Sequence, residues 1–255
     1  MIPEERRDKI LNLIKKEEVC SIKKLVAEFG VSRITIQRDL TMLEESGFLT
    51  KVHGGARVAK QDGNVFESRF NIRYKQNYSK KLRIAKKALT FTAAHECVFI
   101  DSSTTAHVFG LELFRHNIQD ISVITNAPAL LQEANRFPDT KIISTGGELL
   151  RSFSMLAGEW VQDFLDKINI DCAFISAAGV SNDLKITSSN RELASVLSKV
   201  IQRSTEVNLL LDSTKLFRQG MVTVGDLSEC ARIIMDDDVT EEQKVALSRA
   251  GIDIV

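Results

Sequence analysis

The stretch that decides how the first part of the chain folds runs from residue 30 to residue 43 and has the sequence GVSRITIQRDLTML. Gly30 is a typical end for one helix, and Ser32 is a favoured cap for the next. In that next helix Ile36, Leu40 and Leu43 recur at helical spacing, which predicts a buried stripe. The polar residues between them fall on the opposite side. The pattern indicates a helix with one face in a core and one face free to bind.

The sequence on either side of this helix predicts a small compact domain. Residues 3–16 and 22–29 have the apolar spacing of two further helices, and Ser21 can cap the second of them. After the decisive helix, His53-Gly54-Gly55 lies between two short apolar runs and predicts a hairpin. Two helices, a third that can enter the major groove of DNA and a following hairpin make a winged helix-turn-helix. We assign it to residues 1–58.

The free face of the third helix carries side chains suited to DNA. Arg33 and Gln37 are four residues apart and share a face, where Arg suits guanine and Gln suits adenine. We expect Arg38 to contact phosphates, and Asp39, which phosphates would repel, to form an ion pair or a cap within the domain. The residues expected to contact DNA are Ser32, Arg33, Thr35, Gln37, Arg38, Thr41, Lys51, His53 and Arg57.

The distribution of charge agrees with this assignment. The whole chain of 255 residues has a formal net charge of zero, but residues 1–60 carry 12 Lys/Arg against 9 Asp/Glu. A mildly basic module on a mildly acidic larger one is compatible with binding to nucleic acid. The 4 Cys are isolated in the sequence and the 4 His lack metal-ligand spacing, so we expect no metal and no cofactor. Without a signal peptide or a membrane-length apolar run, we expect a cytoplasmic protein.

The rest of the chain predicts a second domain of the α/β class. Residues 59–77 are assigned as a linker and residues 78–255 as an effector-binding and oligomerisation domain. Short apolar runs alternate there with helical patterns, which is typical of a mostly parallel sheet. The predicted strands are 98–100, 121–124, 142–143, 173–175, 207–211, 233–235 and 252–255. The predicted helices include 104–115, 127–136, 155–167, 189–203 and 240–250, with Trp160 on a packing face of the third.

Polar clusters follow several of the predicted strands, at the sheet edge where open α/β sheets bind ligands. Hydroxyl groups and free helix N–H groups after the first strand form an anion site, and a nearby lysine adds a positive charge. Taken singly, each cluster is more often a turn or a cap. The candidate residues are Asp101, Ser102, Ser103, Thr104, Thr105, Thr125, Asn126, Gly146, Gly147, Gly179, Asp212 and Lys215.

Two groups of motifs resemble the DeoR family of bacterial sugar-metabolism regulators. In the first domain they are Ser32-x-x-Thr35-Ile36-Gln37-Arg38-Asp39-Leu40 and Lys51-Val52-His53-Gly54-Gly55-Ala56. In the second they are the segments at the strand ends given above, with Asp171-x-x-Phe174 and Gly179. The resemblance implies a sensor domain folded like ribose-5-phosphate isomerase, a phosphorylated sugar as effector, and double-stranded operator DNA as partner. It adds Asp171, which serves either the ligand or only the strand end.

Three functions remain open from the sequence. The first is a repressor of a carbohydrate-utilisation operon that a phosphorylated sugar releases from DNA; it is not an enzyme, and it forms a dimer or tetramer. The second is a sugar-phosphate isomerase fused to a DNA-binding domain, which requires a general base such as Glu148, Asp171 or Asp212. The third is a DNA-binding protein whose larger domain only oligomerises. Turnover of sugar phosphates would indicate the isomerase, and their binding without turnover would indicate the effector-controlled repressor. The absence of any binding would favour the third function.

Overall fold

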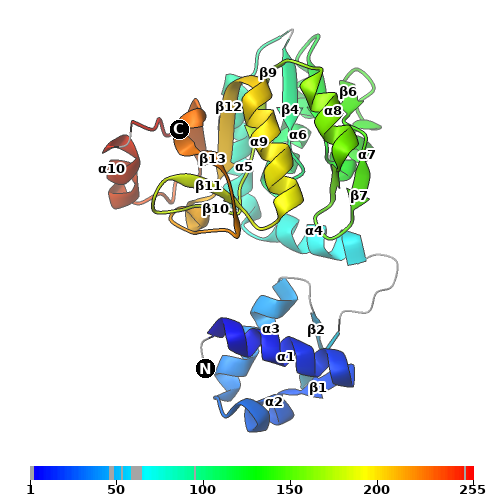
Figure 1. Cartoon of the computed structure of the whole chain (residues 1–255), viewed down its shortest axis with the longest axis vertical. Coiled ribbons are helices and arrows are strands. Elements are labelled where there is room, and N and C mark those ends of the chain that lie inside the picture. The colour runs from blue at the N-terminus through cyan, green and yellow to red at the C-terminus, as the bar shows by residue number, and fades with distance from the viewer. Residues whose placement is uncertain (1–2, 46–48, 53, 59–64, 95, 250) are drawn as a thin grey trace. The chain divides into compact units, whose positions relative to one another are not determined.

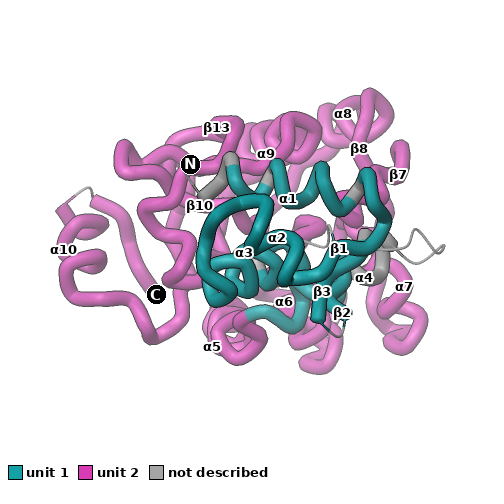
Figure 2. Tube along the Cα trace, turned by 90° about the horizontal axis from the view of Figure 1, so that it is seen from below, with its two compact units in different colours: residues 1–76 teal, residues 77–255 magenta. Residues whose placement is uncertain are grey.

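The computed structural model describes every residue except 1–2, 46–48, 53, 59–64, 95 and 250. The chain divides into two compact units, residues 1–76 and residues 77–255, which Figure 2 shows in different colours. His53, one of the residues expected to contact DNA, lies outside the described residues.

Unit 1 contains the three expected helices, α1 (Pro3–Glu17), α2 (Ile22–Phe29) and α3 (Arg33–Glu45). The caps are where the sequence predicts them. The Ser21 hydroxyl accepts a hydrogen bond from the Lys24 N–H, and Gly30 ends α2 with a positive φ of 61° that suits glycine. Ile36, Leu40 and Leu43 are buried in one core with residues of α1 and α2. The helix-turn-helix prediction is therefore confirmed.

The hairpin after α3 is β2 (Leu49–Val52) and β3 (Gly55–Val58), paired antiparallel. The sequence did not predict β1 (Val19–Ser21), which pairs with β3 and gives the sheet order β1-β3-β2. Three residues are too few for a visible alternation of apolar and polar side chains. A fourth helix, α4 (Val65–Lys75), lies inside the stretch assigned as linker.

Unit 2 is built on a six-stranded sheet in which every neighbouring pair is parallel, as expected (Figure 1). Its order is β14-β12-β9-β4-β5-β6. Of the six strands, the three that come first in the sequence (β4, β5 and β6) therefore lie on one side of the β4–β9 boundary. The three that come last (β9, β12 and β14) lie on the other side. The strands are β4 (Cys97–Ile100), β5 (Ser122–Thr125), β6 (Lys141–Ser144), β9 (Ile170–Ile175), β12 (Ser204–Leu211) and β14 (Arg232–Met235). Residues 252–255 do not form a further full strand, but they run beside β14 through a parallel bridge between Ile233 and Ile254.

Helices cover both faces of this sheet, α5 and α6 on one and α8 and α9 on the other (Figure 1). The buried core includes Phe99, Ala173 and Leu209 from three neighbouring strands. The helices of unit 2 are α5 (Tyr78–Ala88), α6 (Thr104–His116), α7 (Pro128–Ala134), α8 (Glu159–Asp166), α9 (Arg191–Arg203) and α10 (Glu241–Arg249). Short 3-10 helices occupy Leu89–Phe91, Ser213–Lys215 and Leu227–Glu229.

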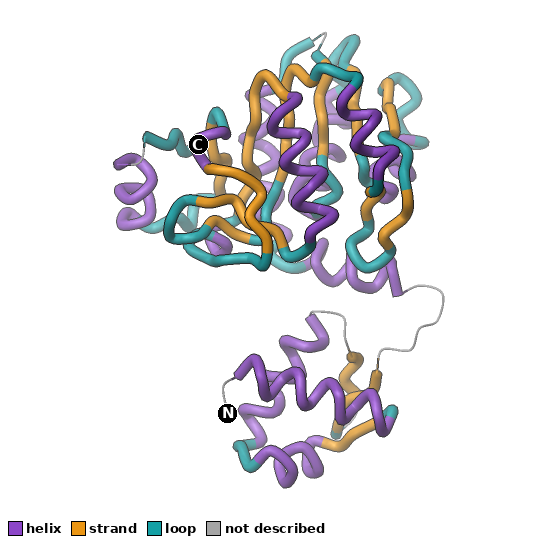
Figure 3. The backbone as a smooth tube through the Cα atoms, in the orientation of Figure 1, coloured by secondary structure: helices purple, strands orange, loops and turns teal. Residues whose placement is uncertain are grey.

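Two smaller sheets accompany the large one (Figure 3). One is the hairpin of β7 (Glu148–Leu150) and β8 (Met155–Ala157), and the other contains β10 (Gly179–Val180), β11 (Lys185–Ser188) and β13 (Val222–Asp226). The predicted helix 155–167 is wrong in its first turn, because residues 155–157 pair with β7 and Gly158, at φ 99°, precedes α8. Trp160 is also misplaced in that prediction, since it is 78% exposed.

Candidate functional site

The outer face of α3 is the candidate DNA contact surface. Ile36 and Leu40 are fully buried, whereas Arg33, Gln37 and Arg38 are exposed on the same helix. Thr41 is half-buried one turn further on, and its hydroxyl donates to the Gln37 carbonyl. The helix therefore keeps its apolar stripe in the core and presents two guanidinium groups and one amide to the outside.

Hydroxyl groups close the amino end of α3. The Ser32 Oγ accepts from the Thr35 N–H at 3.1 Å and lies 2.9 Å from the Thr35 Oγ1. Ser32 is thus the cap of the helix, as predicted. The positive dipole end at the first turn of the helix favours an anion such as a DNA phosphate.

Behind this face, Asp39 is buried and holds α3 against α1. Its carboxylate accepts from Arg6 Nε at 2.6 Å and from Arg6 Nη2 at 3.3 Å, and Arg7 lies 3.9 Å away. The hydrogen bond that Arg6 donates to Asp39 raises the pKa of Arg6. The expectation that Asp39 forms an ion pair within the domain is confirmed.

The two described residues of the wing that were expected to contact DNA differ in how they are held. Lys51 donates through Nζ to the Thr41 hydroxyl at 3.0 Å and pairs with Glu44 at 3.3 Å, so it is tied to α3. Arg57 on β3 is half-buried. Lys51 therefore joins the β2–β3 hairpin to α3 in this structure.

In unit 2 the order of strands reverses between β4 and β9, which is where open α/β sheets bind ligands. The Asp101 carboxylate joins the two strand ends at that point. It accepts from the Ser103 N–H at 3.0 Å in its own loop and from the Ser176 N–H at 3.1 Å in the loop after β9. Burial raises the pKa of Asp101, and these hydrogen bonds together with the positive charge of Lys215 oppose the rise. The buried Asp101 side chain therefore joins the loop after β4 to the loop after β9.

The loop after β12 reaches the same place. Lys215 Nζ donates to the Ala177 carbonyl at 3.0 Å, across to the loop after β9, and lies 3.9 Å from Asp212. Asp212 is buried and caps the short 3-10 helix by accepting from the Thr214 N–H at 3.2 Å. Two loops whose residues are 38 positions apart in the sequence are thereby joined through one ammonium group.

The loop after β4 leads directly into α6. Ser103 caps this helix by accepting from the Ala106 N–H at 3.1 Å. Ser102, Thr104 and Thr105 around the cap are all buried. The start of this 13-residue helix, in a loop where Lys215 acts electrostatically on Asp101, is an arrangement that suits an anion.

Three polar atoms at these strand ends are buried and have no hydrogen-bond partner among the described residues. They are Thr105 Oγ1, Asn126 Oδ1 and Ser176 Oγ. Buried polar atoms of this kind are uncommon in folded proteins, so these three are available to hydrogen-bond a water molecule or a ligand. Sequence reasoning missed Ser176, although its position immediately after β9 was the signal used for the other clusters.

Thr125 and the glycines have structural explanations. The Thr125 hydroxyl donates to the Ile100 carbonyl at 2.6 Å, which links β5 to β4. A Cβ at Gly147 would lie 2.6 Å from the Ala157 carbonyl oxygen, and one at Gly179 would lie 2.3 Å from that of Arg218. These two glycines are required for close packing. Gly146, at φ 66°, has no atom within 4 Å of such a Cβ and needs glycine only for its backbone conformation.

Asp171 does not lie with the other candidates. It is level with Cys97 at the amino end of β9, and it accepts the Cys97 N–H at 2.8 Å. The other candidates follow the carboxyl ends of the parallel strands, on the opposite edge of the sheet. Of the two roles left open for Asp171, the structure supports the one at the strand end, because its carboxylate is used to hold β4.

A buried network leads from the loop after β12 to helix α5. The Asp236 carboxylate accepts from the Ser213 N–H at 2.7 Å and from the Ser213 hydroxyl at 3.0 Å. Lys80 on α5 donates to Ser213 Oγ at 2.7 Å and to Asp236 at 3.2 Å, and pairs with Asp238 at 2.8 Å. Burial alone would lower the pKa of Lys80, but the hydrogen bonds to Asp238 and Asp236 outweigh it and raise that pKa.

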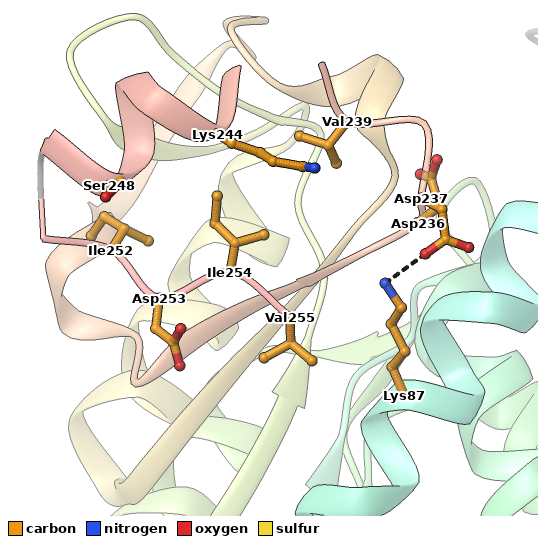
Figure 4. A pocket seen from close by; sticks show the side chains of 10 residues that line it. All are labelled: Lys87, Asp236, Asp237, Val239, Lys244, Ser248, Ile252, Asp253, Ile254 and Val255. Carbon is orange, nitrogen blue, oxygen red and sulfur yellow. Dashed lines mark ion pairs between the residues drawn. The ribbon is translucent and has the colours of Figure 1, made fainter. Parts of the chain in front are cut away.

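A cavity of about 560 Å³ lies elsewhere in unit 2, between the end of α5, α10 and the last residues (Figure 4). Asp236, Lys244 and Ile254 are among the residues that line it, and no candidate effector residue does. Lys87 at its rim pairs with Asp237 at 2.9 Å and donates to the Met235 carbonyl at 3.0 Å. The charges here are used within the protein, so the switch point of the sheet remains the better ligand site.

Neither a metal centre nor a membrane span is found in the part of the chain that the structure describes. No cluster of three or more His, Cys, Asp or Glu side chains is arranged there to hold an ion. Within the same residues, no helix has both the length and the apolar composition to cross a bilayer.

Comparison with known proteins agrees with the two units. Residues 6–62 match the family model of the DeoR-like helix-turn-helix domain, and residues 76–237 match that of the DeoR C-terminal sensor domain.

Similar proteins extend over the whole chain. The HTH-type transcriptional regulator GlpR of Haloferax volcanii is 29% identical over 257 residues, which cover 100% of this chain and 98% of that protein. The lactose phosphotransferase system repressor of Staphylococcus aureus is 28% identical over 255 residues, covering 98% of each. Among solved structures, ribose 5-phosphate isomerase A from Methanocaldococcus jannaschii aligns with a TM-score of 0.41 and 19% identity over 55% of each chain.

Proposed function

Because this chain belongs to the DeoR family of transcription regulators, we propose that it represses a carbohydrate-utilisation operon and leaves its operator when a phosphorylated sugar binds in unit 2. Residues 1–58 contact double-stranded DNA, residues 59–77 connect the units, and residues 78–255 bind the effector and associate with further copies. The names of the similar regulators support the class of function.

The observation that carries the effector proposal is the meeting of three loops at the switch point. The loops after β4, β9 and β12 join there through Asp101, Ser176 and Lys215. The start of α6 and the Lys215 ammonium suit a phosphate, while Asn126 Oδ1 and Ser176 Oγ suit sugar hydroxyl groups. The remaining contributors are Ser102, Ser103, Thr104, Thr105, Thr125, Gly146, Gly147, Gly179 and Asp212, acting directly or by shaping the loops.

A ligand screen by thermal unfolding tests this proposal. A sugar phosphate present at 100 times its Kd should stabilise the full chain by about 2.7 kcal/mol. The parent sugar without its phosphate group should not stabilise the chain. The sugar phosphate should likewise fail to stabilise the Lys215→Met variant. The same compound should release the chain from DNA fragments taken from beside its own gene. Stabilisation by the unphosphorylated sugar alone would contradict the phosphate site.

We also propose that binding occurs without turnover. Of the candidate general bases, Asp171 accepts the Cys97 N–H at the opposite edge of the sheet and Asp212 caps its own loop, which argues against either acting as a base. Incubation of pentose and hexose phosphates with the purified chain should leave them unchanged. Interconversion would favour the isomerase alternative.

The route by which the effector acts on DNA binding is proposed to start at Ser213. A ligand that shifts the loop after β12 changes the hydrogen bonds of Ser213 with Asp236 and Lys80. Lys80 lies in α5, which begins directly after the boundary between the units. A ligand that binds one arrangement of this network more tightly than the other changes the population that binds DNA.

The assembly and location follow from the same role. Operators with two-fold symmetry are bound by symmetric proteins, so we propose a dimer or tetramer, to be measured by sedimentation equilibrium. A repressor must be in the same compartment as its operator, so we propose that the protein is cytoplasmic.

A further inference from the structure

Helix α3 carries an exposed aliphatic side chain that the proposed contacts to phosphate, guanine and adenine do not use. Ile34 is 77% exposed and lies two positions after Ser32, the cap of the helix. Its neighbours on the outside, Arg33, Gln37 and Arg38, are all polar and exposed. An isoleucine there is not needed for the core, which Ile36 supplies.

The position of Ile34 on the helix is the second observation. With about 3.6 residues per turn, Ile34 points almost directly away from the direction shared by Ile36, Leu40 and Leu43. It shares its face with Gln37, Arg38 and Thr41, at the spacings of three, four and seven residues. Ile34 therefore lies at the centre of the surface that faces a DNA groove, flanked by the cationic groups.

The chemistry of the major groove offers one apolar partner for such a side chain. Each base pair displays hydrogen-bond donors and acceptors there, and thymine alone adds a C5-methyl group. The amino-terminal residues of a recognition helix are the ones that contact base edges. We propose that Ile34 packs against the C5-methyl group of a thymine in each half-site, and so makes the chain select thymine at that position.

This inference rests on the proposed DNA-binding function, and the test separates the two. The full chain and its Ile34→Ser and Ile34→Val variants are each used to select sites from a random duplex pool. Each thymine of the wild-type consensus is then replaced, one at a time, by deoxyuridine, which removes only the methyl group. Affinities are measured by fluorescence anisotropy at one fixed salt concentration.

We expect one thymine per half-site at which deoxyuridine weakens binding by the wild-type chain about fourfold, the effect of one buried methyl group. The Ile34→Ser variant should show no loss at that position, and Ile34→Val should keep most of it. Val245→Ser, which removes an exposed apolar side chain from α10 in unit 2, should behave as wild type.

Three results overturn the inference. One is a consensus in which no thymine is required, and another is equal binding of every deoxyuridine duplex by the wild-type chain. The third is the same deoxyuridine sensitivity in the Ile34→Ser variant. If the wild-type chain selects no sequence at all, the DNA-binding function itself fails, which is a different outcome.

Discussion

The two candidate surfaces of this chain are built in opposite ways. On α3 the polar side chains are exposed and come from a single helix, whereas at the switch point of unit 2 the polar side chains are buried and come from loops far apart in the sequence. The open surface suits a partner that is itself a large, charged groove. The closed one suits a small molecule whose polar atoms must each be matched. The difference teaches that the candidate surface on α3 is organised within one element, while the candidate effector site depends on loops from several strands of the sheet.

The largest effect is expected at the Arg6–Asp39 ion pair, which lies behind the exposed surface of α3. Replacing Asp39 with Asn should destabilise unit 1 by about 3 kcal/mol, because it leaves the Arg6 guanidinium without its buried partner. Hydrogen exchange measured by mass spectrometry should show faster exchange in α1 and α3 and no change in the sheet of unit 2. The exposed Glu28→Gln change is the matched control. Equal loosening of both units would show that their stabilities are not separate.

A pH test addresses the closed surface. Burial lowers the pKa of His107, on α6, from 6.5 to about 4. The unfolded chain therefore binds a proton at this site in a pH range where the folded chain does not, and stability falls as the pH decreases from 6.5 towards 4. We expect a loss of about 2 kcal/mol between pH 7 and pH 5 from this residue. Urea unfolding of His107→Gln should lack that part of the loss, whereas His116→Gln, at an exposed histidine, should retain it.

A third test asks whether the closed surface communicates with the unit boundary. Lys80→Met removes the ammonium group that joins Ser213 to α5. The effector should still stabilise the variant, but the concentration that releases DNA should rise about fivefold, a coupling change near 1 kcal/mol. Arg83→Met is the control, because Arg83 lies on the same helix as Lys80 and pairs with Asp237 and Asp238, which follow β14. A Lys80→Met variant that releases DNA as wild type does would exclude this route.

The smallest effect is expected at the edge of the open surface. Arg38→Ala should weaken binding to many duplex sequences alike and reduce the slope of log affinity against log salt by about 0.9, the value for one phosphate contact. Gln37→Ala, at the neighbouring position, should instead change the preferred base. A change of base preference with Arg38→Ala, at an unchanged salt slope, would show that Arg38 contacts a base.

The same contrast explains how far the sequence alone could predict this molecule. The caps at Ser21 and Ser32 and the glycine end at Gly30 depend on neighbours a few residues away, and local spacing predicts them. The ion pair or cap expected of Asp39 came instead from its charge, and its partner Arg6 lies 33 positions away. The six strands of the large sheet were also found, because buried parallel strands are continuous apolar runs.

What the sequence could not predict depends on pairing at a distance. Strand β1 and residues 155–157 take their conformation from partner strands, which override a weak or helical local pattern. Asp171 looked like the other carboxylates until the register of β4 and β9 placed it at the opposite edge of the sheet. Ile34 has no polar side-chain atom, so the hydrogen-bonding residues of α3 gave no indication of it.

The residues beside β14 have a practical consequence. The Met235 N–H donates to the Val255 carbonyl and the Val255 N–H donates to the Ile233 carbonyl, both at 3.0 Å, so the outermost strand is screened along its free side. An unscreened strand is a template on which another polypeptide can add. Removing the pairing of residues 252–255 with β14 should therefore promote self-association into insoluble aggregates.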